Sequence, residues 1–131
     1  WIHPAVAIIT LLLLTATAYA KLGPKTYFRA HYALAIATVI GVLLSFGMAV
    51  YAVARCDCQD DWPASLSIHI PAALLFTLFI LGQAAMGVTM RVIGRKPRLL
   101  RAHRLNARIV LGLAASVLLL GIGSVVLMVA A

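Results

Sequence analysis

Residues 24–31 read PKTYFRAH, and residues 97–103 read PRLLRAH. Each stretch leads from a basic turn through Arg-Ala-His into a long apolar run, and the two closing histidines are 72 residues apart (103 − 31). A second echo joins His3-Pro4 to His69-Ile70-Pro71, 66 residues later (69 − 3). The sequence therefore predicts two copies of one helical hairpin, with a histidine near the start of every helix.

The composition requires a bilayer as the solvent. The chain has 131 residues, of which 64% are hydrophobic and 11% are charged, whereas soluble domains average roughly 25% charged residues. Four apolar runs are each near or above the roughly 20 residues that cross a bilayer. They are expected to form helices at about residues 2–20, 27–53, 64–90 and 99–129. We predict an all-α membrane protein, one domain over residues 1–131, folded as an up-down-up-down four-helix bundle with a two-fold pseudo-repeat of helices 1–2 and 3–4.

The charges are segregated along the chain. Ten of the eleven basic residues lie within 21–29 and 91–108, while all three acidic residues share the loop that follows Arg55. By the positive-inside rule, the basic loops (21–29 and 91–104) are predicted to be cytoplasmic. The two termini and the loop 54–63 then lie on the outer side, which is periplasmic in a bacterium. This distribution explains the net charge of +8 without a nucleic-acid partner.

The residues near the ends of the apolar runs allow more than one interpretation. Ala18-Tyr19-Ala20 resembles a signal-peptidase site, but basic residues follow the first run instead of preceding it, which favours a retained helix. Because the chain opens on Trp1 and not on Met, we expect native residues before it. Pro4 and Pro71 most simply mark helix first turns, although Pro71 could instead kink the third helix.

Topology suggests how the four histidines pair. Odd-numbered helices start on the outer side and even-numbered helices on the inner side, so His3 and His69 share the outer level and His31 and His103 the inner one. Each pair faces across a diagonal of the predicted bundle, where two neutral imidazoles can take both axial positions of one haem. A titratable group at membrane depth is costly and usually functional. We therefore predict two haem b groups, with irons roughly 20 Å apart along the membrane normal.

Each histidine shares its helix face with small and weakly polar residues. These are Ala7, Thr10, Leu14 and Thr17 with His3; Leu34, Ala35, Thr38, Val42, Ser45 and Ala49 with His31; Ala73, Phe76, Ile80, Gln83 and Gly87 with His69; and Ala107, Val110, Ala114, Val117 and Gly121 with His103. Such faces leave volume for a macrocycle, but small residues also pack membrane helices tightly without any cofactor. The sequence leaves both interpretations open.

Arginines near the inner histidines are candidate partners for haem propionates. Arg29 and Arg101 each precede an inner histidine by two residues, and Arg104 follows His103 directly. Guanidinium groups bind carboxylates with paired hydrogen bonds. The alternative is that these arginines set topology and contact anionic lipids.

Together, the four helices, the histidine near each start, His3-Pro4 and the repeated Arg-Ala-His resemble the four-helix core of the cytochrome b561 superfamily. That resemblance implies two b haems, one near each membrane face, ligated by His3 with His69 and by His31 with His103, and electron transfer across the bilayer. Better-known eukaryotic members have extra flanking helices and take electrons from ascorbate. This chain shows no such helices, so a quinol or a partner redox protein is the expected electron donor.

The expected function is thus that of a di-haem b-type cytochrome, an electron-carrying subunit of a larger redox complex in the membrane, with no evident substrate-conversion site of its own. The alternative is a subunit that binds chlorophyll or bacteriochlorophyll, or a structural subunit without a cofactor. Hydrolytic chemistry has no support, because the carboxylates sit in one loop away from any paired nucleophile and base.

The acidic loop, Cys56-Asp57-Cys58-Gln59-Asp60-Asp61, is the second unusual feature. Its cysteines allow a strained ring, a bond to another chain, a metal site with the aspartates, or a plain loop with free or locally bonded thiols. Its charge suits docking of a basic periplasmic redox protein.

Overall fold

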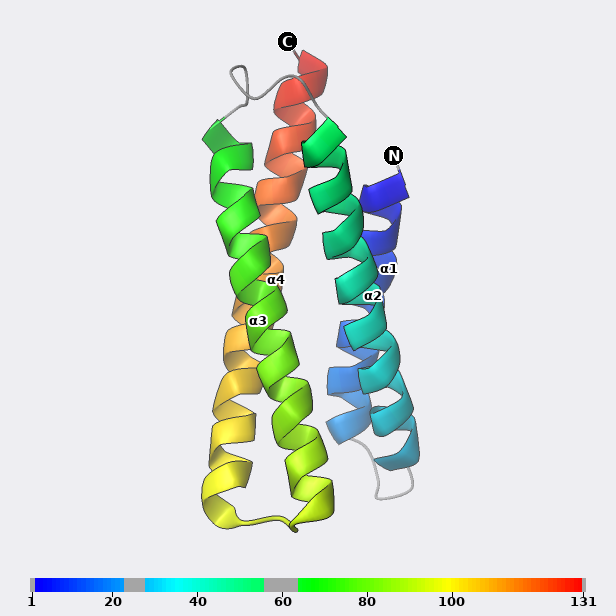
Figure 1. Cartoon of the computed structure of the whole chain (residues 1–131), viewed down its shortest axis with the longest axis vertical. Helices are drawn as coiled ribbons and strands as arrows, with labels where there is room; N and C mark the ends of the chain where they lie inside the picture. The colour runs from blue at the N-terminus through cyan, green and yellow to red at the C-terminus, as the bar shows by residue number, and fades with distance from the viewer. Residues whose placement is uncertain (1, 23–27, 56–63, 131) are drawn as a thin grey trace. The chain divides into compact units, whose positions relative to one another are not determined.

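The structure is a computed structural model that describes residues 2–22, 28–55 and 64–130. These residues form four α-helices and no strand: α1 (Ile2–Leu22), α2 (Phe28–Arg55), α3 (Ala64–Val92) and α4 (Pro97–Ala130) (Figure 1). All four are long and apolar enough to cross a membrane. The prediction of an all-α membrane protein with four spanning helices is confirmed.

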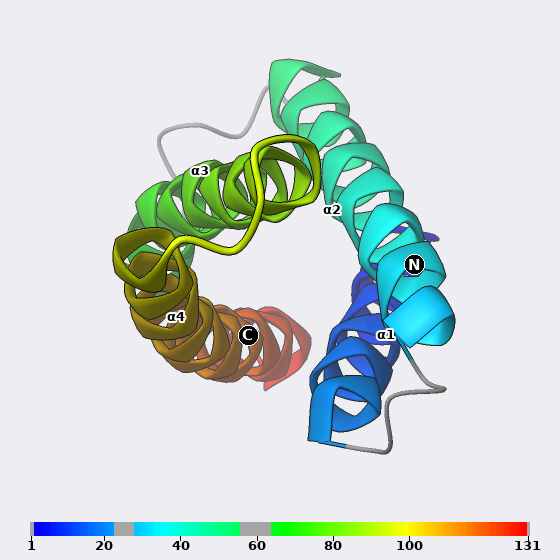
Figure 2. The same cartoon turned by 90° about the horizontal axis from the view of Figure 1, so that it is seen from below.

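The helices pair as two antiparallel hairpins. Helix α1 packs along α2, and α3 packs along α4 (Figures 1 and 2). The chain divides into two compact units, Trp1–Arg55 and Cys56–Ala131, each containing one hairpin. The predicted alternation of direction therefore holds within each hairpin, and each is described below by itself.

The helices run slightly past the apolar segments that predict them. Helices α1, α2 and α3 end two residues later than expected, and α4 begins at Pro97, two residues earlier. A helix is held by backbone hydrogen bonds, which continue into polar residues at the membrane surface. Proline suits the first position of α4 because it needs no N–H there, and the Lys96 carbonyl accepts the Leu100 N–H at 3.0 Å.

Two prolines behave differently. Pro4 lies in the first turn of α1, as expected, but Pro71 lies well inside α3, which begins at Ala64. The expectation that Pro71 marks a first turn is wrong, because the polar residues before it are helical as well. Having no N–H, Pro71 leaves the Ser67 carbonyl without its usual helical donor.

The turn between α3 and α4 depends on one glycine. The Ile93 N–H still bonds to the Thr89 carbonyl at 2.9 Å, and Gly94 then adopts a φ of +88°. This left-handed conformation costs glycine little and commonly ends a helix. The basic turn thereby reverses the chain within a few residues.

Most buried residues of the two hairpins lie at equivalent positions of the repeat; the exceptions in the described residues are Thr17, Ser45, Thr77 and Ser124. The offset of 66 relates two buried residues of α1 to two of α3, and the offset of 72 relates two of α2 to two of α4. The equivalent pairs are Thr10 with Phe76, Leu14 with Ile80, Thr38 with Val110, and Val42 with Ala114. Every buried apolar side chain in the described residues belongs to one of these pairs. The predicted pseudo-repeat is therefore also a repeat of packing.

The predicted histidine faces are the faces that pack inside each hairpin. Most large side chains on the other faces are exposed, as Leu12 and Leu119 are at 66% and 69%, which suits lipid contact. The buried hydroxyls mostly bond to their own helix: Thr10 donates to the Val6 carbonyl and Thr38 to the Leu34 carbonyl, each at 2.8 Å. Polar groups can thus be buried without leaving hydrogen bonds unmade in an apolar solvent.

Candidate functional site

His31 lies in the first turn of α2 and reaches across to α1. Its Nδ1 is 2.8 Å from the carbonyl oxygen of Thr17. A carbonyl only accepts hydrogen bonds, so the proton of the neutral imidazole is on Nδ1 and Nε2 carries the lone pair. This is the arrangement in which a protein holds a metal-ligating histidine through its second nitrogen.

His3 makes the reciprocal contact at the other end of the same hairpin. Its Nδ1 is 3.0 Å from the carbonyl oxygen of Ser45 on α2 and 3.3 Å from the Ser45 hydroxyl oxygen. The carbonyl again places the proton on Nδ1 and the lone pair on Nε2. In the first hairpin, each imidazole is thus oriented by a backbone oxygen of the neighbouring helix.

His103 is held by side chains instead. The Asn106 amide nitrogen donates to the Phe79 carbonyl at 3.0 Å and to the Gln83 side-chain oxygen at 2.9 Å. Because the Phe79 carbonyl can only accept, it fixes which end of the Asn106 amide is nitrogen, and Asn106 in turn fixes the orientation of the Gln83 amide. The Gln83 NH₂ therefore donates to His103 Nε2 at 3.2 Å. His103 consequently has its lone pair on Nε2, as His3 and His31 do.

His69 lies against a glycine of α4. A Cβ built on Gly121 would come within 3.2 Å of His69 Cε1 and 3.6 Å of Nδ1, and Nδ1 is buried. Glycine at this position provides room for the imidazole between the helices. His103 lies similarly near Gly87 on α3, with 3.9 Å from its Cε1 to a Cβ built there.

The two histidines of a hairpin are at opposite ends of it. His3 precedes Thr17, the contact of His31, by 14 residues (17 − 3), and His69 precedes Gln83, the contact of His103, by the same number (83 − 69). At 1.5 Å per residue this is about 21 Å along each helix. Iron–nitrogen bonds are far shorter, so the two histidines of one hairpin cannot bind the same iron.

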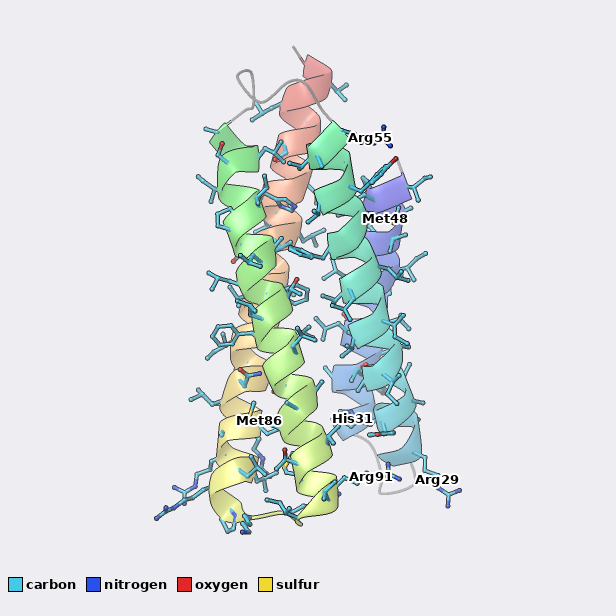
Figure 3. All side chains as sticks on the ribbon, in the orientation of Figure 1. Arg29, His31, Met48, Arg55, Met86 and Arg91 are labelled. Carbon is cyan, nitrogen blue, oxygen red and sulfur yellow. The ribbon has the colours of Figure 1, made fainter. Side chains whose placement is uncertain are left out.

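The candidate propionate partners lie on different helix faces from the histidines. Arg29, Arg101 and Arg104 are all exposed. Residues two apart are about 200° apart around a helix, so Arg29 and Arg101 lie roughly opposite His31 and His103 on their helices. Figure 3 shows Arg29 and Arg55 at the two ends of α2. A role toward propionates remains a prediction.

Sequence reasoning did not identify Asn106, which anchors the second hairpin's polar network. The signal was present: an amide three residues after His103 shares a helix side with it, and polar groups of membrane helices usually face a partner. Thr17, Ser45 and Gln83 were on the predicted faces, but their roles depend on the register of the neighbouring helix. The Cys56–Asp61 loop and its predicted partner lie outside the described residues.

No known family model, curated protein or solved structure matches this chain. The relationship to the cytochrome b561 superfamily therefore stays a prediction from the histidine pattern.

Proposed function

We propose that this chain is a di-haem b-type cytochrome that carries electrons across a membrane, as a subunit of a larger redox complex with a quinol or redox-protein partner. The observation that supports it best is the protonation pattern of the imidazoles. His3, His31 and His103 each have the lone pair on Nε2, which is a nitrogen that binds haem iron.

The levels of the histidines also support two cofactors. Since the histidines of one hairpin are about 21 Å apart along the helix, an iron with two histidine ligands needs one from each hairpin. The repeat relates His3 to His69 and His31 to His103, which makes these the proposed axial pairs. Bound haem supplies one-electron redox chemistry, and the chain's own task is to orient the imidazoles through the Thr17 and Ser45 carbonyls.

The sidedness of the protein is part of the proposal. With the basic loops in the cytoplasm, the His31–His103 pair lies at the inner level and the His3–His69 pair at the outer one. Two redox centres at the two levels would let electrons cross an otherwise insulating layer. Quinol would approach from within the membrane, and a redox protein would dock on the outer loop.

A structural subunit without a cofactor is the second candidate. It is favoured by the interhelical hydrogen bonds, because His3 and His31 already join α1 to α2 and such bonds stabilise membrane helix pairs by themselves. A pigment-binding subunit would need only one imidazole per magnesium and no opposed pairs.

The test is the cofactor content of single histidine variants. The full chain, made in a haem-supplied host and purified in detergent, should show a b-type band in the reduced-minus-oxidised spectrum and two haems per chain. His31→Ala and His103→Ala should each remove the same haem, and His3→Ala and His69→Ala the other. Ser116→Ala is the matched control, because Ser116 is exposed and donates to the Gly112 carbonyl of its own helix.

Three outcomes would reject the proposal. A purified chain without haem that folds normally favours the structural subunit. Extraction of chlorophyll instead of haem favours the pigment protein. Haem that survives all four substitutions shows that the histidines are not its ligands.

A further inference from the structure

Helix α4 is longer than a bilayer requires. Its 34 residues extend about 51 Å, whereas the hydrocarbon core is about 30 Å thick. Residues 109–130 carry no charge and are long enough to fill that core. With residues 109–130 in that core, the first three turns of α4, residues 97–108, would lie at the level of the lipid headgroups.

Three arginines of this segment form one exposed face. Arg101, Arg104 and Arg108 follow each other at i, i+3 and i+7, and all three are exposed; we call them the arginine face. The buried positions Val110 and Ala114, which pack inside the hairpin, lie on the other side of α4. The arginine face is thus turned away from α3 and spans about 11 Å along the helix.

The second hairpin provides no negative charge near this face. Helices α3 and α4 and the turn between them contain no Asp or Glu, and the acidic residues of the chain precede α3 in the sequence. Three guanidinium groups side by side repel each other unless an anion lies among them. An anion bound at this face would therefore come from outside helices α3 and α4 and their turn.

The surface of α4 that follows the arginine face toward the C-terminus is apolar and exposed. Gly112, Ala115 and Leu119 continue the same stripe, at 4, 7 and 11 residues beyond Arg108, and all are exposed. A Cβ on Gly112 would meet nothing within 4 Å. One strip of helix therefore offers guanidinium groups at headgroup level and then a smooth apolar surface at acyl-chain depth.

We propose that this strip binds an anionic glycerophospholipid. The arginine face binds the phosphate through the paired N–H groups of guanidinium, and an acyl chain lies along Gly112, Ala115 and Leu119. An acidic protein would satisfy the arginines but would leave the apolar part of the strip unused. The continuity of charge and apolar surface along one face identifies a lipid as the occupant.

The test titrates phosphatidylglycerol into the full chain in a neutral detergent, with phosphatidylcholine as the reference, and counts bound lipids by native mass spectrometry. The triple variant R101Q/R104Q/R108Q should bind phosphatidylglycerol roughly 100-fold more weakly, on the basis of the contribution of each basic residue near a membrane surface. The matched control is R91Q/R95Q/K96Q, which removes the same charge from the end of α3 and the following turn and should change binding only a few-fold.

A second variant tests the acyl-chain part. Gly112→Leu keeps all charges and fills the open surface, so it should weaken phosphatidylglycerol binding about tenfold with no effect on helix content by circular dichroism. Equal losses for both triple variants would mean diffuse attraction and overturn the site. Unchanged binding by Gly112→Leu would also overturn it, and would indicate a partner without acyl chains. None of these measurements depends on haem.

Discussion

The two hairpins use the same positions with different chemistry. In α1–α2 the buried interface contains Thr10 and Thr38, whereas α3–α4 has Phe76 and Val110 at the equivalent positions. His31 donates a hydrogen bond to a backbone carbonyl, but its counterpart His103 accepts a hydrogen bond from the Gln83 side chain. The comparison shows that the two copies of a repeat can place an imidazole at the same position and hold it with different hydrogen bonds.

The difference matters for any ligand of the imidazole. A backbone carbonyl on Nδ1 leaves Nε2 of His31 directed elsewhere, and no substitution of Thr17 removes that carbonyl. At His103 the Gln83 amide lies on Nε2 itself, the atom that would bind a metal. A ligand of His103 Nε2 would therefore first have to displace the Gln83 amide, whereas the hydrogen bond of His31 uses its other ring nitrogen.

The largest expected effect is at the closest approach of α1 and α2. A Cβ on Gly41 would come within 2.6 Å of the Thr10 hydroxyl oxygen, and that short, branched side chain cannot swing away. The equivalent position of α4 is Leu113 (41 + 72). Gly41→Leu, which copies the second hairpin into the first, should destabilise α1–α2 packing by about 3 kcal/mol, measured by unfolding in mixed micelles.

Its control is Gly47→Leu, in the same helix, where a Cβ meets nothing within 4 Å. This variant should unfold within about 0.5 kcal/mol of the parent chain. If both variants unfolded alike, the close contact of the first hairpin would have no energetic importance.

An intermediate effect, on haem affinity, is expected at the residues that contact His103 and His31. Gln83→Leu removes the amide from His103 Nε2, so the haem proposed at His103 should bind up to about tenfold more tightly, as one competing hydrogen bond of about 1 kcal/mol is lost. Thr17→Val, at the equivalent position of α1, should leave haem affinity unchanged because His31 uses the backbone. Haem titration followed by absorbance measures both.

The result separates two kinds of failure. A chain that binds no haem in any form contradicts the proposed function. A chain that binds haem equally well with and without Gln83 contradicts only the competition at His103. ¹⁵N NMR of the labelled imidazoles gives a further measurement, since Nε2 of His103 should stay unprotonated in the parent chain.

The smallest effect is expected where His3 contacts Ser45 in the first hairpin. His3 bonds to the Ser45 carbonyl at 3.0 Å and more distantly to its hydroxyl at 3.3 Å. Ser45→Val copies Val117 (45 + 72) from the second hairpin and keeps the carbonyl, so stability should fall by less than about 0.5 kcal/mol. A loss of several times that size in the same micelle assay would show that the hydroxyl, and not the carbonyl, holds the imidazole.

The sequence was sufficient for the helices and for their buried faces. A period of 3.6 residues counted from each histidine identified Thr38 and Val42, and likewise Val110 and Ala114, which are buried. The hydrogen-bond partners of His31 and His3 could not be predicted from the sequence, because Thr17 and Ser45 act through backbone atoms that every residue has. Their selection depends on how far one helix slides along the other, which contacts such as Gly41 against Thr10 determine.

The interhelical hydrogen bonds described for His3, His31, His103 and Asn106 each close within one hairpin. A hairpin that pairs these polar groups internally brings a finished unit to the insertion machinery as soon as its second helix is made. Synthesis of the chain would then proceed as two successive insertion events, each hiding its own imidazoles from lipid. A gene that doubled such a hairpin would double a segment already able to enter the membrane, and each copy could afterwards change its internal chemistry without blocking the entry of the other.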